Sequence, residues 1–193
     1  MKEKKAHIFD RAKDEWYVEP IWVTLGLLEH VTFFGGVWDP ACGGGNILSA
    51  CDLMDIESIG TDIVDRGKAT RLIDFLSYDG PPLAPNIIMN PPFGKSETAE
   101  LFIRKALSVA KEKVATFVDQ RFLGSSRRAG GLFKEHRPLK VFQITPRPSC
   151  PPGDWIEAGG KPGGGTADYV WIVWDSVYPE DATMFDWMRC DRA

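Results

Sequence analysis

The chain has 193 residues, of which 44% are hydrophobic and 26% charged, and its formal net charge is −4. These values are ordinary for a globular protein with one full core. No apolar run is long enough to span a membrane, and no apolar segment follows the charged residues 1–5, so we expect neither a membrane protein nor a secretory signal. The four cysteines form no Cys-x-x-Cys pair and the three histidines are scattered. We therefore expect no metal site, and reduced thiols in a cytoplasmic protein.

Residues 1–15 are polar and predict a flexible N-terminus. Residues 16–193 alternate short apolar runs with helical patterns and contain no linker, which predicts one α/β domain with a mainly parallel central sheet flanked by helices. Helices are expected over residues 21–28, 47–53 and 98–111, and strands over residues 37–38, 59–63, 85–89, 113–119, 141–145 and 168–174.

Three further stretches carry weaker patterns. Residues 120–136 are interrupted by glycines and predict helix or loop. Residues 146–166 predict a Pro/Gly-rich loop, and a loop of that length inside a compact domain is usually functional or mobile. The residues after 175 predict only a short tail.

A polar amide, two prolines and an aromatic ring follow the strand expected at residues 85–89, namely Asn90, Pro91, Pro92 and Phe93. In an open α/β sheet, ligands bind at the carboxyl ends of the strands. The prolines fix the backbone and leave carbonyl oxygens free to accept, Asn90 adds a side-chain oxygen, and Phe93 offers a flat apolar face. The stretch predicts a site for a planar group that carries an NH2, although Asn and Pro are also common in simple turns.

A glycine turn follows the strand expected at residues 37–38. Residues 39–46 lead from that strand into a helix, and their glycines allow a ligand to approach the backbone closely. The next strand ends in Asp62, whose carboxylate suits the two hydroxyls of a ribose. The dinucleotide-binding fingerprint lacks its last glycine, where Leu48 stands, and the phosphate-loop pattern before Lys95 fails at Met89. We therefore expect a nucleoside ligand that is poor in phosphate.

Basic residues gather in one stretch of this acidic protein. Residues 121–147 hold seven Arg and Lys against one Glu, which gives 7 − 1 = +6, so the remainder carries −4 − 6 = −10. Such a patch can hold a phosphate backbone, although a charge run is more often a solvated helix face. The candidates for phosphate contacts are Arg121, Arg127, Arg128 and Lys134.

Residues 39–45, Asp62, residues 74–76 and residues 90–93, in this order, resemble the motifs of the S-adenosylmethionine-dependent methyltransferases that act on N6 of adenine. The likeness is greatest to the small DNA adenine methyltransferases of phages and prophages, and it covers roughly residues 17–174. It implies a Rossmann-like methyltransferase fold, S-adenosylmethionine as cofactor, and adenine-containing duplex DNA as partner. Larger members carry a separate target-recognition domain, for which this chain has no room. We therefore expect a short or degenerate target sequence or help from dimerisation; monomer and dimer both stay open.

The resemblance also implies a role for each residue of the cofactor site. The turn after the first strand would line the methionine end of the cofactor, the acid of the second strand would hold the ribose, and the third motif would hold the cofactor adenine. A segment on the N-terminal side would pack on the methionine moiety. The cofactor-binding residues are thus Tyr17, Pro20, Asp39, Pro40, Ala41, Gly43, Asp62, Asp74, Phe75 and Asn90.

In the catalytic motif, the side-chain oxygen of Asn90 and the carbonyl of Pro91 would accept the two N–H bonds of the target amine. Phe93 would stack on the flipped-out base. Three other functions remain open: methylation of RNA adenine or protein glutamine, a non-catalytic module that binds the cofactor for a partner protein, and a nucleotide-dependent oxidoreductase. The glutamine enzymes favour Tyr where Phe93 stands, and the incomplete dinucleotide fingerprint weighs against an oxidoreductase.

Overall fold

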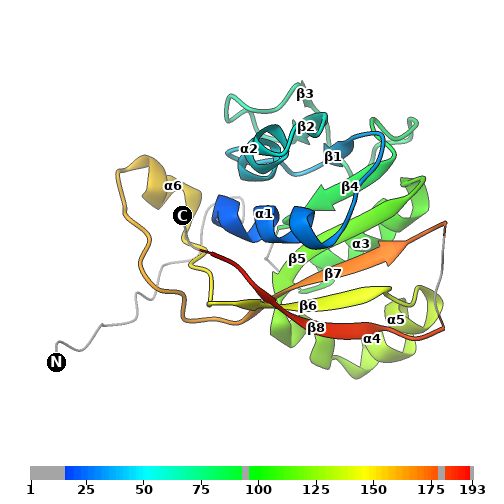
Figure 1. The fold of residues 1–193 in the computed structure, drawn as a ribbon. Helices are drawn as coiled ribbons and strands as arrows, with labels where there is room; N and C mark the ends of the chain where they lie inside the picture. Colours follow the sequence, from blue (N-terminus) through cyan, green and yellow to red (C-terminus); the bar gives the residue numbers. More distant parts are fainter. Residues whose placement is uncertain (1–15, 93–95, 178–180, 192–193) are drawn as a thin grey trace, which may run out of the picture.

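A computed structural model of the chain describes residues 16–92, 96–177 and 181–191. The expected flexible N-terminus at residues 1–15 and the side chain of Phe93 lie outside the described residues. Helices lie on both faces of one central sheet (Figure 1). In chain order the elements are α1 (Ile21–His30), β1 (Val37–Asp39), α2 (Asn46–Leu53), β2 (Ser58–Asp62), β3 (Arg71–Leu72), β4 (Asn86–Met89), α3 (Ser96–Val109), β5 (Lys113–Asp119), η2 (Gln120–Gly124), α4 (Ser126–Gly130), α5 (Leu132–Glu135), β6 (Lys140–Thr145), α6 (Gly153–Glu157), β7 (Tyr169–Asp175) and β8 (Met184–Arg189).

The eight strands lie in the order β3-β2-β1-β4-β5-β7-β6-β8. β7 runs antiparallel to β5 and to β6, and the other five neighbouring pairs of the described sheet are parallel. The prediction of an α/β protein with a mainly parallel sheet is confirmed. Parallel neighbours need crossover connections, which α2 supplies between β1 and β2 and α3 supplies between β4 and β5.

The central strands of the sheet are buried on both faces, because they are apolar at successive positions, whereas the two edge strands β3 and β8 are mostly exposed. In β4, Ile88 packs with Val37 and Val23 beneath α1 and α2, whereas Ile87 faces the other core with Ile103 of α3. Figure 1 shows α1 in front of the sheet and α3, α4 and α5 behind it. This arrangement leaves the carboxyl ends of the parallel strands open for a site.

Three of those ends lie side by side. β1 ends at Asp39 and β2 at Asp62, and β4 is followed at once by Asn90. The register pairs Val37 of β1 with Ser58 of β2 on one side and with Asn86 of β4 on the other. The carboxyl ends of these three strands therefore reach the same edge of the sheet. The glycine turn, the acid and the catalytic motif expected from the sequence therefore meet in space.

Several elements differ from the sequence prediction. Residues 120–136 form three short helices, η2, α4 and α5, and the loop over residues 146–166 contains α6. The expected tail after residue 175 includes a strand, β8, which pairs in parallel with β6 at the outer edge of the sheet. β8 escaped prediction because most of its side chains are exposed, so it carries no burial pattern that a sequence would reveal.

Candidate active site

A cavity of about 270 Å³ opens at the carboxyl ends of β1, β2 and β4. Its walls come from the segment before α1, the glycine turn, the ends of β2 and β4, and the stretch after β3. Of the residues expected at the site, those that line the cavity are Tyr17, Asp39, Pro40, Ala41, Gly43, Asp62, Asp74, Phe75, Asn90, Pro91 and Pro92. Residues that the sequence did not single out also line it, among them Trp16, Glu19, Ile63, Arg66, Leu76 and Phe102.

The glycine turn is held by the two acids at the strand ends. Oδ1 of Asp39 accepts a hydrogen bond from the backbone N–H of Ala41 at 3.1 Å, and Oδ2 of Asp62 accepts one from the N–H of Gly43 at 2.8 Å. Gly43 has a φ of +48°, and a Cβ there would stand 2.7 Å from Nε1 of Trp16. The close approach of Trp16 and the left-handed backbone both require glycine at this position.

Asp62 makes further contacts within the protein. Its Oδ1 accepts the backbone N–H of Val64 at 2.9 Å and pairs with Nη1 of Arg66 at 3.2 Å. The guanidinium of Arg66 also lies 4.4 Å from the centre of the Trp16 ring. A ribose bound to Asp62 would therefore take the place of Arg66 at Oδ1.

Asn90 is held through its amide nitrogen, while its amide oxygen has no partner among the described residues. Its Nδ2 donates to the carbonyl oxygen of Tyr17 at 3.0 Å and to Oε2 of Glu19 at 2.6 Å. A carbonyl oxygen can only accept, so the contact with Tyr17 fixes which end of the amide carries the nitrogen. Oδ1 of Asn90 is buried and has no hydrogen-bond partner among the described residues. Leaving a buried acceptor unpaired costs about 1–3 kcal/mol, which marks Oδ1 as a position prepared for a ligand donor.

Glu19 is a candidate site residue that the sequence analysis did not predict. It precedes Pro20 and α1, and its carboxylate is buried behind Asn90. Burial raises the pKa of Glu19 to about 7, against smaller opposing effects of its own backbone and of the Asn90 amide. Burial, and then the charges of Glu19 and Asp62, also raise the pKa of Asp39 well above its usual range. The one available signal was an acid inside an otherwise apolar run, residues 16–23, just before a helix.

Of two further residues expected to bind the cofactor, one lies outside the cavity and the other lies on its wall. Pro20 caps α1 and lines a neighbouring recess rather than the cavity. Phe75 reaches the cavity wall, but it is almost fully buried and packs edge-on against Trp38, with ring centres 5.2 Å apart. The loop that carries Phe75 also presents Asp74, whose Oδ1 accepts the backbone N–H of Leu76 at 3.1 Å.

The four basic residues expected to contact phosphates differ in exposure and in their partners. Arg121 is exposed and pairs with Asp119 at 2.7 Å, and Lys134 is exposed on α5. Arg127 pairs with the buried Glu100 at 2.7 Å. Arg128 is only 5% exposed, and its Nε donates to the carbonyl of Phe122 at 2.8 Å while its guanidinium lies 4.0 Å from the centre of that ring.

The prediction that Arg128 contacts phosphates is therefore corrected. The burial that hides its guanidinium also lowers its pKa, and its role is to hold η2 and α4 together. Among the described residues, no group of three or more His, Cys, Asp or Glu is arranged to hold a metal ion. None of the described helices is long and apolar enough to cross a membrane.

No family model matches the chain, and no curated protein sequence matches it. Several solved structures do match the chain. The M protein of the type I restriction enzyme EcoKI is 17% identical, with a TM-score of 0.57 over 91% of this chain and 49% of that protein, so this chain spans about half of its length. A possible histamine N-methyltransferase from Thermotoga maritima is 13% identical, with a TM-score of 0.52 over 80% and 88% of the two chains. Magnesium protoporphyrin IX methyltransferase from Synechocystis is 12% identical, with a TM-score of 0.53 over 80% and 77%. The expected Rossmann-like methyltransferase fold is confirmed by these similarities.

Proposed function

We propose that this protein transfers a methyl group from S-adenosylmethionine to the exocyclic N6 amine of adenine in DNA. The observation that carries the proposal is the buried, unpaired Oδ1 of Asn90 beside Pro91 at the cavity wall. An amide that is locked through its nitrogen and has its oxygen free is suited to accept an N–H bond from a planar amine. The fold and the motif order support the same activity.

The chemistry of the cavity fits the cofactor. Glu19, Asp39 and Asp62 all line it, and burial is the main cause that raises the pKa values of the first two carboxyl groups. Buried charge of one sign is costly unless a ligand of the opposite sign compensates it. S-adenosylmethionine carries a sulfonium and an ammonium group, and when bound it supplies an electrophilic methyl group.

The remaining walls divide between polar and apolar contacts. Asp62 would hold the ribose hydroxyls, which would compete with Arg66, its present ion-pair partner at 3.2 Å. Ile63, Leu76 and Phe102 line the same cavity and provide apolar surfaces for the cofactor adenine. Ile63 and Leu76 are large apolar side chains that stay exposed in the described structure, so a flat ring would cover surface that now faces water.

Catalysis would depend on acceptors for a nitrogen that becomes positively charged. The lone pair of the target amine is delocalised into the base, and acceptors at its two N–H bonds favour a tetrahedral, nucleophilic nitrogen. Oδ1 of Asn90 and the carbonyl oxygen of Pro91 would provide them. Since both interactions strengthen as positive charge grows, they stabilise the transition state more than the ground state. Glu19, at 2.6 Å from Nδ2, makes the amide oxygen more negative and holds it in place.

DNA is proposed as the substrate on two grounds. The sequence motifs resemble those of DNA adenine methyltransferases, and one of the similar structures is the M protein of a type I restriction enzyme. A target base inside a duplex must be flipped out at a cost of a few kcal/mol, of which stacking on an aromatic ring such as Phe93 returns ~1–3 kcal/mol. Phosphate contacts would supply the rest, and Arg121, Arg127 and Lys134 remain the candidates.

The experiment that tests the proposal offers labelled S-adenosylmethionine with unmethylated duplex DNA, RNA and bulk protein in parallel reactions. We expect label in DNA, recovered as N6-methyladenine. Label only in RNA or protein would keep the cofactor and overturn the substrate. Cofactor binding by calorimetry without transfer to any substrate would instead favour a non-catalytic module.

A further inference from the structure

A second recess, of about 420 Å³, opens on the same edge of the sheet at the ends of β5, β6 and β7. Its walls include Gln120, Gln143, Arg147, Asp168, Phe185 and Trp187. We propose that this recess binds a nucleobase of the substrate strand other than the target adenine, and so contributes to sequence preference. This inference rests on the proposed function, because it assumes that the substrate is a nucleic acid.

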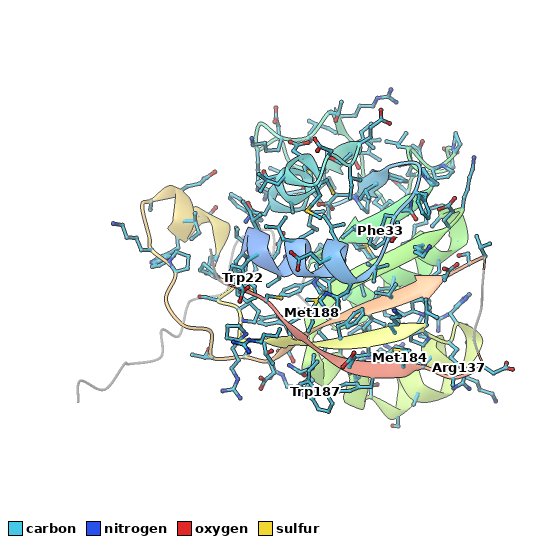
Figure 2. All side chains as sticks on the ribbon, in the orientation of Figure 1. Trp22, Phe33, Arg137, Met184, Trp187 and Met188 are labelled. Carbon is cyan, nitrogen blue, oxygen red and sulfur yellow. The ribbon has the colours of Figure 1, made fainter. Side chains whose placement is uncertain are left out.

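The aromatic wall comes from the outermost strand. Phe185 and Trp187 are 47% and 66% exposed, and their rings meet edge-to-face with centres 5.3 Å apart. Phe185 pairs in register with Val141 and Trp187 with Gln143, so both rings stand on the face of the sheet that α4 and α5 cover further inward. Figure 2 shows Trp187 on the outer side of β8, whereas Met188 lies between β8 and α1. A large exposed aromatic face of this kind is what base stacking uses.

The polar wall contains an amide that the protein does not satisfy. Gln143 is 8% exposed, and its Oε1 has no hydrogen-bond partner among the described residues. Its Nε2 makes only long contacts, 3.3 Å to the carbonyl of Tyr169 and 3.4 Å to that of Ile144. An amide presents a donor and an acceptor side by side, which matches the edge of a base, adenine in particular. A buried amide held this loosely is available to turn toward a ligand.

Charged residues line part of the recess, and its distance from Asn90 fits the spacing of bases along a DNA strand. Arg147 pairs with Asp168 at 2.7 and 3.1 Å beside the two aromatic rings. Three strand spacings separate β4 from β6 in the sheet, which is roughly 14 Å. Because the nucleotides of one strand of B-form DNA rise ~3.4 Å each along the helix axis, a base about four steps from the target would reach the recess. The proposed phosphate contact Arg121 lies on η2, directly after the Gln120 that lines the recess.

The test measures binding of labelled oligonucleotides by fluorescence anisotropy and methyl transfer to DNA for the wild type, Trp187→Ala and Trp187→Phe. Phe34→Ala is the matched control, since Phe34 is 69% exposed on a turn outside both cavities. We expect Trp187→Ala to weaken binding and raise KM by about 5- to 100-fold, with the cofactor Kd and the transfer rate at saturating DNA unchanged. Trp187→Phe should keep most of the affinity, and Phe34→Ala all of it. Gln143→Leu should change the preferred base at one position away from the target adenine.

Equal behaviour of Trp187→Ala and Phe34→Ala would overturn the proposal while leaving the methyltransferase function intact. A fall in molecular mass in solution on Trp187→Ala, with unchanged DNA binding, would overturn it in favour of a second copy seated on β8. Oligonucleotide binding that depends on Trp187 without methyl transfer would support the recess and refute the proposed function.

Discussion

Replacement of Glu19 by Gln isolates the role of the buried carboxylate, because the side chain keeps its length and can still accept a hydrogen bond from Asn90. The reacting nitrogen would lie roughly 7 Å from the Glu19 carboxylate. This distance combines the 2.6 Å bond from the carboxylate to Nδ2, the width of the amide, about 2 Å, and a hydrogen bond of about 2.9 Å from Oδ1 to the target amine. At an effective dielectric constant of about 20, a carboxylate at that distance stabilises half a positive charge by about 1.2 kcal/mol. Loss of charge assistance in the bond to Asn90 adds about 1 kcal/mol.

The sum, about 2.2 kcal/mol, predicts that Glu19→Gln lowers the rate of methyl transfer about 40-fold above pH 8. Since burial raises the pKa of Glu19 to about 7, the wild-type kcat/KM should increase with pH up to about 7 and then level off, whereas the variant should show no such rise. The assay is the pH profile of kcat/KM for both proteins. An inflection that persists in Glu19→Gln would refute this assignment and point to Asp39, whose pKa burial also raises.

The raised pKa of Glu19 also predicts how the free energy of unfolding changes with pH. The pKa of Glu19 is about 7 in the folded protein against 4.5 for the ordinary group, so its contribution is fully present below pH 4.5 and is lost as the pH rises through 7. The loss amounts to about 3 kcal/mol, and Gln at this position does not titrate. In urea denaturation, Glu19→Gln should therefore gain stability relative to the wild type between pH 5 and pH 8. A stability difference that is the same at both pH values would contradict the raised pKa.

The other predictions concern the cofactor and the basic surface. Asp62→Asn should raise the calorimetric Kd for S-adenosylmethionine by about 10-fold or more, because the carboxylate loses its charge-assisted bonds; an unchanged Kd would remove Asp62 from the ribose site. Gly43→Ala should weaken cofactor binding and lower the melting temperature, because its φ is +48° and the added Cβ meets Trp16; unaltered binding would show that the turn yields easily. Arg121→Gln with Lys134→Gln should make the slope of log K for DNA against log salt shallower by about 0.9 per lost contact, and a slope that stays the same would place the DNA elsewhere.

The sequence predicted those parts of the site that lie at the carboxyl ends of the parallel strands. The ends of β1, β2 and β4 could be placed together from strand order alone, since parallel strands share a carboxyl edge. Asp39, Asp62 and Asn90 therefore meet as the pattern indicated. The predicted bounds of the strand over residues 113–119 are also correct, because its five central residues are all buried and only Thr116 among them is polar.

The residues that were missed depend on contacts that only the fold creates. Glu19 binds Asn90, a residue 71 positions away, and its place in an apolar run before a helix is the one local sign that it is buried. Arg128 seemed available because basic residues surround it, but the turn of η2 brings Phe122 over its guanidinium. Trp187 lay in an expected tail, and its place beside Gln143 follows from the pairing of β8 with β6.

The central claim is that Oδ1 of Asn90 accepts a hydrogen bond from the target amine. The most direct measurement is the single-turnover rate of methyl transfer to DNA by Asn90→Ala and the wild type, with both proteins saturated with S-adenosylmethionine as checked by calorimetry. Removal of one well-placed acceptor should slow transfer by ~10²–10³-fold even when the variant is saturated with cofactor. A variant that transfers methyl groups at the wild-type rate would show that Oδ1 does not touch the reacting amine.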